Sequence, residues 1–474
     1  MAVRRLHHTS VSLHLLVAMV LVLTTAVIST APVRAGTTIT VTEMIDEFNE
    51  LSNNSGDCSV REAIVAANED RAIGGCPAGS GADTIIVPVG TYTLAIDGVE
   101  GRGIADDLNI TEDVTLRGAG IGKTIIDGDG RFVIKSLHSN DGNDYPAVMI
   151  DGMTLQHAYG GGDAGGGAIN NSLGSLLIRR VLIRDSEAAQ GAAINNSGTL
   201  VVQSSIITGN HARYDGGGIY HNEGDGSLQI LGTSIRGNSA VFTGGGLYVQ
   251  NGDAVMRNST ISGNTARDGG GIYVYVAGSL RARNTTISGN HADASGGGIR
   301  NGTRVQSGDY FGTVALANVT VSNNSTDGDD SDAPLTFVVG GGGLAGPATL
   351  RNTIIAGNTD ASSRGDDCVL MQTSEGHNLI GDTNGCAITG SAIGNQLNVD
   401  PLLGPLADNG GPTRTHALLD GSPAIDRGNP NTPDGGGWRC TASDQRGTTR
   451  PQDGDGLFHA RCDIGAYERQ ANHS

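Results

Sequence analysis

The feature that most constrains this chain is a glycine-rich repeat in its middle. Each unit opens with three glycine or alanine residues followed by isoleucine or leucine, and closes near Ile-x-Gly-Asn. Successive openings lie 25, 25, 28, 25, 27 and 45 residues apart, so the last unit must carry an insertion. The openings begin at Gly166, Gly191, Gly216, Gly244, Gly269, Gly296 and Gly341. Units this short have no room for a pair of helices, which favours a stack of short strands.

Apolar and polar residues alternate within each unit, as in Thr260-Ile261-Ser262, which is the period of a β-strand. Equivalent strands stacked at about 4.8 Å would form parallel sheets around a column of aliphatic side chains. One expected column follows the openings and contains Ile169, Ile194, Ile219, Leu247, Ile272, Ile299 and Leu344. A second lies near the end of each unit and contains Ile183, Ile207, Ile235, Ile261, Ile287, Val321 and Ile355. We therefore predict an all-β fold, a right-handed parallel β-helix. The alternative, a β-propeller, would need blades of about 40 residues.

Asparagine recurs at two positions of the unit, where its amide can bond to the backbone or to the next amide in a stack. One column closes the units at Asn210, Asn238, Asn264, Asn290, Asn324 and Asn358. The other lies six residues earlier in several units, at Asn258, Asn284, Asn318 and Asn352. Less regular strand-like segments begin at residues 84–87. We expect the solenoid to span residues 83–360, between an N-terminal cap of residues 36–82 and a C-terminal cap of residues 361–474.

Composition and charge exclude several other classes. The 75 glycines show no three-residue period, which excludes collagen. Acidic residues number 49 against 30 basic ones, a net charge of −19, which argues against nucleic acid as a partner.

Residues 1–35 have the pattern of a secretory signal peptide. Arg4 and Arg5 precede an apolar run over residues 11–28, and Val33-Arg34-Ala35 places small residues at the −3 and −1 positions of a cleavage site. An uncleaved membrane anchor is the alternative. No later segment approaches the about 20 apolar residues that span a bilayer. We expect a secreted, monomeric mature chain that starts near Gly36.

Six cysteines lie after the signal peptide. No C-x-x-C pair occurs, so a zinc ribbon or a thioredoxin-type site is disfavoured. An even number of cysteines in an exported chain indicates disulfides. Fifteen connectivities exist for six cysteines, and the local clustering favours Cys58–Cys76, Cys368–Cys386 and Cys440–Cys462.

A short amphipathic helix is expected just before the solenoid. Val60, Ala63, Ile64 and Ala67 follow helical spacing, and Ser59 with Glu62 three residues later has the pattern of a capping box. This helix would lie with its apolar face on the first coil. A role for Glu62 as a catalytic acid is the less favoured alternative.

Both ends of the chain resemble exported bacterial β-helix proteins. The stretch 58–63, Cys-Ser-Val-Arg-Glu-Ala, is similar to the CSLREA motif, with Val60 where that motif has leucine. Residues 83–92, 117–120 and 126–128 are similar to the segments on the C-terminal side of the motif in that family. The C-terminal part resembles the "choice-of-anchor Q" region, and the matching stretches are 401–406, 409–411, 415–417, 421–426, 444–447 and 463–468. Residues 166–169 are also similar to the repeats of polymorphic outer-membrane proteins.

This resemblance implies a pectin-lyase-like β-helix exported to the cell envelope or beyond. Only residues 469–474 come after the last matching stretch. They hold no sorting signal and no transmembrane tail, so free secretion is favoured over anchoring.

Several residues are of types that could have a chemical role, but their place in the repeat accounts for them equally well. The stretch 117–124 ends in Gly-Lys-Thr, but a phosphate-binding loop would need glycine where Arg117 stands, so we interpret it as a turn. His211 and His291 occupy the same position of their units, which favours solvated turns over a metal site. Acidic clusters at 127–130, 141–144, 327–332 and 453–456 could hold Ca²⁺, although none matches an EF-hand loop and solvated turns are favoured.

The enzyme hypothesis rests on Asp215 and Asp268. Both directly precede a glycine opening, two units apart. At about 4.8 Å per strand they would lie about 10 Å apart, at the far edge of the spacing in inverting glycosidases. A polysaccharide lyase would need a base, and the chain has only Lys123 and Lys135 as lysines.

The binding hypothesis rests on Tyr220, Tyr248 and Tyr273, which come directly after the buried aliphatic residue of three successive units. Strand alternation would turn them outward as a flat aromatic strip on which sugar rings could pack. The alternative, which we favour for these three residues, is an aromatic ladder that only stabilises neighbouring strands. We favour an adhesive or glycan-binding protein that requires no cofactor. A polysaccharide lyase or glycoside hydrolase is the first alternative and a structural surface spacer the second.

Overall fold

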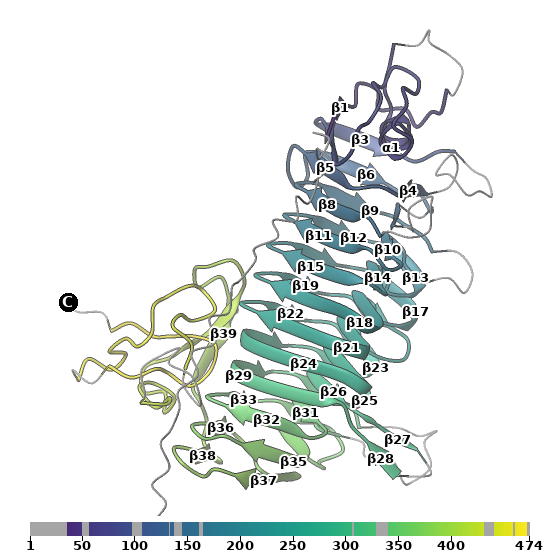
Figure 1. The fold of residues 1–474 in the computed structure, drawn as a ribbon. Coiled ribbons are helices and arrows are strands. Elements are labelled where there is room, and N and C mark those ends of the chain that lie inside the picture. The colour runs from purple at the N-terminus through teal and green to yellow at the C-terminus, as the bar shows by residue number, and fades with distance from the viewer. Residues whose placement is uncertain are drawn as a thin grey trace, which may run out of the picture. The chain divides into compact units, whose positions relative to one another are not determined.

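The computed structural model describes residues 36–49, 56–96, 107–131, 133–136, 145–160, 165–305, 308–328, 340–430, 440–457 and 460–471. The predicted signal peptide, residues 1–35, lies outside these ranges. The described part contains one α-helix, α1 (Val60–Asn68), and most of its strands stack one above another in Figure 1. The described residues after 418 form loops without a further strand. No helix among the described residues is long and apolar enough to cross a bilayer.

Parallel pairing joins the strands into four files, which are the sides of the coils. The file after the glycine openings contains β4 (Leu108–Ile110), β7 (Ile134–Ser136), β10 (Ile169–Asn171), β14 (Ile194–Asn196), β18 (Ile219–Leu231), β21 (Leu247–Arg257), β24 (Ile272–Ser288), β26 (Ile299–Asn301), β31 (Leu344–Ala345) and β35 (Cys368–Ser374). The second file shares β18, β21, β24 and β35 and adds β1 (Thr38–Thr40), β2 (Asp83–Val87), β5 (Val114–Gly118), β8 (Ala147–Asp151), β11 (Ser175–Arg179), β15 (Thr199–Gln203), β29 (Thr313–Ser322), β32 (Ala348–Arg351) and β37 (Cys386–Gly390).

The third file shares β24 and β29 and adds β3 (Gly90–Thr93), β6 (Thr124–Asp127), β9 (Thr154–Gln156), β12 (Leu182–Arg184), β16 (Ile206–Thr208), β19 (Ser234–Arg236), β22 (Thr260–Ser262), β33 (Ile354–Ala356), β36 (Leu379–Ile380) and β38 (Gln396–Leu397). The fourth file is shorter and contains β13 (Glu187–Gln190), β17 (His211–Asp215), β20 (Ser239–Ala240), β23 (Thr265–Asp268), β25 (His291–Ser295), β30 (Ser325–Thr326) and β34 (Thr359–Asp360). Two antiparallel hairpins lie outside the files: β27 (Thr303–Val305) with β28 (Gly308–Tyr310), and β39 (Leu403–Ala407) with β40 (Thr415–Leu418).

The predicted aliphatic columns are present. Ile219 pairs with Leu247, and Leu247 pairs with Ile272, in parallel register. All three side chains are fully buried. The column near the end of each unit pairs in the same way, from Ile183 through Ile261 to Ile355. The parallel β-helix is therefore confirmed.

The closing asparagines form a continuous ladder of amides inside the coils. Asn210 donates through Nδ2 to Asn238 Oδ1 at 2.8 Å, and the same bond repeats at each later asparagine as far as Asn358. The last donor, Asn358 Nδ2, lies 2.9 Å from Asp367 Oδ1. Every bond has the same direction, so the positive ends of the amide dipoles face the Asp367 carboxylate. Burial raises the pKa of Asp367 to about 6, against the lowering effect of its hydrogen bonds.

The second asparagine column provides the left-handed backbone of a corner. Asn258, Asn284, Asn318 and Asn352 have φ between 46° and 54°, a region that asparagine tolerates better than most residues. The glycines at the openings serve close approach between coils. A β-carbon at Gly217 would lie 2.2 Å from the Ser239 carbonyl oxygen of the next coil, so no larger residue fits there without displacing backbone.

The stack is longer than the regular repeat. It begins with β1, which pairs with β2 before the expected start at residue 83. It ends with β37 and β38, beyond residue 360, and the Cys368–Cys386 disulfide joins the coils there. The glycine signature is absent from these last coils, which is why the repeat alone did not show them.

Helix α1 closes the N-terminal end. Ser59 Oγ accepts from the Glu62 amide at 3.1 Å, and Glu62 Oε2 accepts from the Ser59 amide at 3.0 Å, so the predicted capping box is confirmed. Burial raises the pKa of Glu62. The carboxylate also accepts from the Asn49 amide, which is a structural role. All three predicted disulfides are present.

Residues beyond 400 pack against the third file. Thr260 Oγ1 donates to the Arg414 carbonyl oxygen at 2.6 Å, and Ser288 Oγ lies 2.8 Å from His416 Nε2. Further along the stack, the Ala466 amide donates to Thr320 Oγ1. These contacts occupy the outer surface of that side. Among the described residues, outer side chains at the fourth file such as Tyr214, Val241 and Phe242 are exposed, and we call this side of the coils the open flank.

Candidate functional site

The three tyrosines predicted to bind sugar do form a stack. Tyr220 pairs in register with Tyr248, and Tyr248 with Tyr273. Their ring centroids are 5.0 Å and 5.4 Å apart, with interplanar angles of 17° and 26°. The register and the stacking therefore agree with the sequence prediction.

The accessibility of these tyrosines was predicted wrongly. Tyr220, Tyr248 and Tyr273 are only 6%, 7% and 6% exposed. They point out of the aliphatic core, but the glycine turn covers the base of each ring. A β-carbon at Gly244 would lie 2.9 Å from Tyr248 Cβ. Alternation along the strand therefore predicts correctly that the tyrosines point out of the core. It does not predict that the glycine turn folds over them and buries them.

The hydroxyls of Tyr220 and Tyr273 are hydrogen-bonded, and burial keeps all three tyrosines uncharged at neutral pH. Tyr220 Oη donates to Gln250 Oε1, and Tyr273 Oη donates to the Gly302 carbonyl oxygen at 3.3 Å. Burial, with a smaller contribution from the nearby Asp215 carboxylate, raises the pKa of Tyr220 to about 12. Burial likewise raises the pKa of Tyr273 to about 12 and that of Tyr248 still further. This arrangement is the one expected of a structural ladder.

Asp215 and Asp268 lie two coils apart, as predicted. Asp215 bridges to Thr243 and Thr243 bridges to Asp268 in parallel register. Thr243 Oγ1 donates to Asp215 Oδ1 at 2.5 Å, and Gln190 Nε2 lies 3.4 Å from the other carboxylate oxygen. The threonine thus stands between the two acids. Their role in catalysis stays a prediction.

An exposed aromatic pair that the sequence reasoning missed lies beside these acids. Tyr214 and Phe242 occupy adjacent coils, with ring centroids 6.0 Å apart and ring planes within 3° of parallel. Each side chain is 43% exposed. The Phe242 amide donates to the Tyr214 carbonyl oxygen at 2.9 Å, so the backbones are paired at this point.

Two neighbouring coils each carry an extra residue at this point. A third coil, between Asn290 and Gly296, carries one as well, and its counterpart residue, Ala294, is buried. Six positions separate Asn210 from Gly216, and six separate Asn238 from Gly244. In the units on either side the corresponding spacing is five. The register shifts accordingly between Ala188 and Gln190. A bulge re-aims the side chain that it inserts, and here the inserted side chains are the two aromatic rings. The sequence signal for this bulge was the six-residue spacing between the closing asparagine and the next glycine opening.

Further side chains extend this pair into a surface that we call the aromatic ledge: Tyr159, Arg213, Tyr214, Val241 and Phe242. Tyr159 and Val241 are 39% and 47% exposed. The Arg213 guanidinium lies over the Tyr159 ring, 5.9 Å from its centroid, which is a cation–π distance. The ledge thus brings exposed aromatic and aliphatic side chains and one cation together on neighbouring coils.

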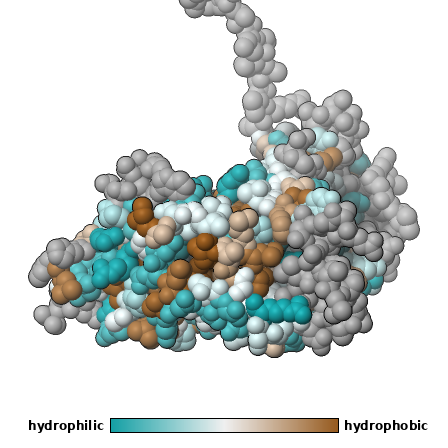
Figure 2. All heavy atoms as spheres, turned by 90° about the horizontal axis from the view of Figure 1, so that it is seen from below, coloured by the Kyte–Doolittle hydropathy of each residue, from teal (hydrophilic) through white to brown (hydrophobic). Residues whose placement is uncertain are grey.

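Figure 2 shows one face of the molecule for comparison. Hydrophobic residues gather there in small groups separated by hydrophilic ones. Exposed apolar residues are therefore not unusual in themselves. The ledge differs because its aromatic rings are parallel and lie on adjacent coils.

The acidic clusters differ in what surrounds them. Asp127 Oδ2 accepts from Gln156 Nε2 at 2.7 Å and lies 3.0 Å from His157 Nδ1, and these contacts lower its pKa despite burial. Asp426, Asp453 and Asp455 offer oxygens within 4.8 Å of one another. The Asp426 oxygens, however, accept from the Gly454, Asp455 and Arg461 amides. Residues 141–144 and 329–332 lie outside the described residues, and calcium binding stays a prediction.

A groove of about 450 Å³ lies between the third file and residues 408–414. Its lining contains Arg236, Arg414 and one carboxylate, Asp408. Glycoside hydrolysis commonly uses two carboxylates that flank the scissile bond. The described lining of this groove therefore does not supply the pair, and it offers the hydrolase hypothesis no second site.

The other singled-out residues lie in turns or on outer surfaces. Residues 119–123 connect β5 to β6, and Thr124 Oγ1 donates to the Pro88 carbonyl oxygen at 2.8 Å. The predicted turn is confirmed. His211 Nδ1 lies 2.8 Å from Ser239 Oγ, and His291 Nδ1 lies 2.9 Å from Ser325 Oγ.

Comparison with solved structures places the fold. The pectate lyase Pel9A aligns with a TM-score of 0.50 at 14% identity, over 91% of this chain and 96% of that chain. The fold is a right-handed parallel β-helix. The A-module of the mannuronan C-5 epimerase AlgE4 of Azotobacter vinelandii aligns with a TM-score of 0.40 at 16% identity, over 72% of this chain and 92% of its own. PfbA, a surface adhesin of Streptococcus pneumoniae, aligns with a TM-score of 0.33 at 12% identity, over 76% of this chain and 95% of its own.

The sequence itself has no such match. No family model matches the chain, and no curated protein matches its sequence. The pectin-lyase-like fold is shown, while the resemblance of the two ends to the CSLREA and choice-of-anchor Q regions stays a prediction.

Proposed function

We propose that this chain is an exported, non-catalytic glycan-binding protein that holds a sugar chain against the aromatic ledge. The observation that carries this proposal is the pair of parallel rings, Tyr214 and Phe242, each 43% exposed on adjacent coils. Aromatic side chains with one apolar face and a polar edge suit ligands of mixed polarity. The adjacent Asp215 and Thr243 supply hydrogen-bonding groups beside the rings.

The cellular location is part of the same proposal. Three disulfides within the described chain support an oxidising compartment outside the cytoplasm. Together with the signal-peptide pattern of residues 1–35, they favour secretion, with or without retention at the cell surface.

A lyase or hydrolase remains the second candidate, because Asp215 and Asp268 stand two coils apart in one register file beside the ledge. A purified mature chain screened on a glycan array, and then assayed for reducing ends and unsaturated products, separates the two functions. Binding without turnover supports the proposal. Turnover that disappears in Asp215→Asn or Asp268→Asn would replace it with catalysis.

The binding site is tested by exchanging the rings. Tyr214→Ala with Phe242→Ala should abolish binding of the best array ligand. The matched control is Tyr310→Ala, because Tyr310 is a similarly exposed tyrosine, 42% exposed, on the β27–β28 hairpin. Equal loss in the control, or full binding by the double variant, would refute the assignment to the ledge. No binding by the intact chain to any array glycan would favour the surface spacer.

A further inference from the structure

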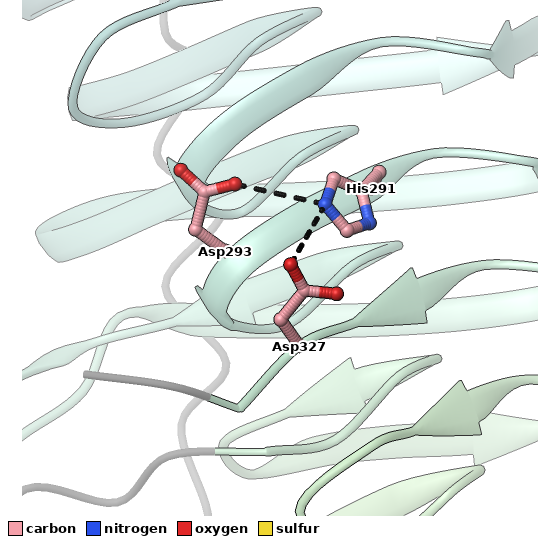
Figure 3. Close-up of side chains that lie close together, drawn as sticks. All are labelled: His291, Asp293 and Asp327. Carbon is pink, nitrogen blue, oxygen red and sulfur yellow. Dashed lines mark ion pairs between the residues drawn. The ribbon is translucent and has the colours of Figure 1, made fainter. Parts of the chain in front are cut away.

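A second group of chemically reactive side chains lies on the open flank, where β25 and β30 meet. His291 pairs with Ser325, and Ala292 pairs with Thr326. The Asp327 amide continues the ladder by donating to the Ala292 carbonyl oxygen at 3.1 Å. Side chains alternate along a strand, so His291 and Asp293 share the outer side while Ala292 is fully buried. Figure 3 shows that the imidazole and the carboxylates of Asp293 and Asp327 turn toward one another.

The separations within this group are too long for hydrogen bonds. His291 Nε2 lies 3.6 Å from Asp293 Oδ1 and 3.6 Å from Asp327 Oδ2. An N–H···O bond is about 2.9 Å long. Zinc bonds of about 2.1 Å in tetrahedral geometry place neighbouring ligand atoms about 3.4 Å apart. His291 Nε2 therefore lies at ion-pair distance from both carboxylates, and the same two separations are close to those between neighbouring ligands of one zinc ion.

Ser325 fixes the orientation of the imidazole. His291 Nδ1 lies 2.9 Å from Ser325 Oγ. When Nδ1 donates its hydrogen to that oxygen, the lone pair of Nε2 faces the two carboxylates. A hydrogen-bonded outer nitrogen that fixes the tautomer is the usual support of a histidine metal ligand.

Electrostatics points the same way. Asp293 and Asp327 follow paired residues on adjacent parallel strands, so two like charges stand beside each other across the coils, which is unfavourable without a cation. Arg267, on the preceding strand β23, is the cation nearest in register to Asp293. That strand pairs with β25 on the side opposite to β30, so Arg267 neighbours only one of the two acids in register.

A matched position in the same file lacks the acids. His211 and Ser239 repeat the histidine–serine pair at 2.8 Å. The residues two positions later, however, are Arg213 and Val241. The pair alone is therefore a repeat feature, and the two aspartates are what distinguishes the later coils.

We propose that His291, Asp293 and Asp327 hold one divalent transition-metal ion of the zinc class, with water completing a tetrahedron. The imidazole ligand favours zinc-class ions over calcium or magnesium, which prefer oxygen ligands throughout. The ligands come from two successive coils, so the ion joins β25 to the next strand of the file only when those coils are stacked. The side chains are 35%, 67% and 62% exposed, which leaves the site open to solvent ions.

Metal titration of the full mature chain tests this assignment. ZnCl₂ is titrated in competition with a chromophoric chelator, and CoCl₂ is added separately to record its visible spectrum. We expect one tight zinc per chain and the intense absorption of tetrahedral cobalt. His291→Ala and Asp327→Asn should abolish both signals. Ser325→Ala should weaken binding by about 10–100-fold, as supporting residues of metal sites do.

Two controls separate this site from other ligands of the chain. His211→Ala retains every proposed ligand and should bind zinc as the unaltered chain does. Asp455→Asn alters the other acidic group and should also leave binding unchanged. Circular dichroism of each variant verifies the fold. Loss of binding in either control, retention in His291→Ala, or cobalt with an octahedral spectrum would overturn the proposal.

Discussion

Two aromatic stacks lie within a few residues of each other on the same coils, and they have opposite environments. Tyr220, Tyr248 and Tyr273 come after the glycine turn and are almost completely buried, whereas Tyr214 and Phe242 precede it and are nearly half exposed. Both stacks keep parallel register from coil to coil. In a β-helix, the position of an aromatic residue relative to the turn therefore decides whether its ring supports the fold or faces solvent.

The comparison is tested most severely by truncating one ring in each stack. Tyr248→Ala should lower the free energy of unfolding by about 3–5 kcal/mol, because it opens a cavity among packed aromatic rings. Tyr214→Ala should change it by no more than about 0.5 kcal/mol, as at an ordinary surface position. Denaturant unfolding with the disulfides intact measures both. Equal losses would show that the exposed pair is structural too.

Alkaline pH should destabilise the chain through the buried stack. The pKa of Tyr220 is about 12 in the folded state, above the ordinary value of 10. Its contribution to stability is therefore fully present below pH 10 and is lost as pH rises towards 12. Tyr220→Phe should flatten this part of the stability–pH profile. An absorbance titration of tyrosinate provides an independent measurement, and a profile unchanged by the substitution would contradict the assignment.

Ligand affinity should depend on the exposed pair and not on the buried stack, which is the reverse of what is expected for stability. Phe242→Ala should weaken glycan binding about tenfold, close to the 0.5–1.5 kcal/mol typical of aromatic contacts. Tyr220→Phe should leave affinity unchanged, since its hydroxyl is occupied by Gln250. Calorimetry with the ligand found on the array measures both. A larger loss of affinity in Tyr220→Phe than in Phe242→Ala would indicate that the ligand binds at the buried stack.

A small effect on stability is also expected from deleting Phe242 entirely. The deletion gives this unit the five-residue spacing found between Asn264 and Gly269 and removes its bulge, so the fold should keep its stability to within about 1 kcal/mol. Binding should nevertheless fall as it does in Phe242→Ala. Unfolding of the deletion variant would mean that the bulge is required by the coil rather than by a ligand.

The regular part of the molecule was predictable because the same constraint recurs in each unit. A pattern repeated in each unit produces the columns of Ile219 and Ile261 and the amide ladder. The capping box at Ser59 arises from one complete local motif. The pairing of six cysteines was predictable from their clustering. The repeat alone therefore sufficed to predict the fold of the regular coils, whereas the irregular coils at both ends of the stack were not visible in it.

The site was predicted less well because it depends on departures from the repeat. Burial of Tyr248 depends on how a glycine turn folds over its neighbour, which alternation along a strand does not contain. Exposure of Tyr214 and Phe242 depends on large rings at a bulge position that a third unit fills with the small, buried Ala294. The group around His291 needs side chains from two coils whose relative register only the stack defines.

The amide ladder has a consequence for how such a chain can change in length. Every inner asparagine donates to the coil on one side and accepts from the coil on the other, so an inner unit can be copied and both new neighbours still find partners. Asp367 only accepts, and it stops the chain of amides. An inner coil can therefore be duplicated without leaving an amide unpaired. The coil that carries Asp367 has to stay at the end of the ladder.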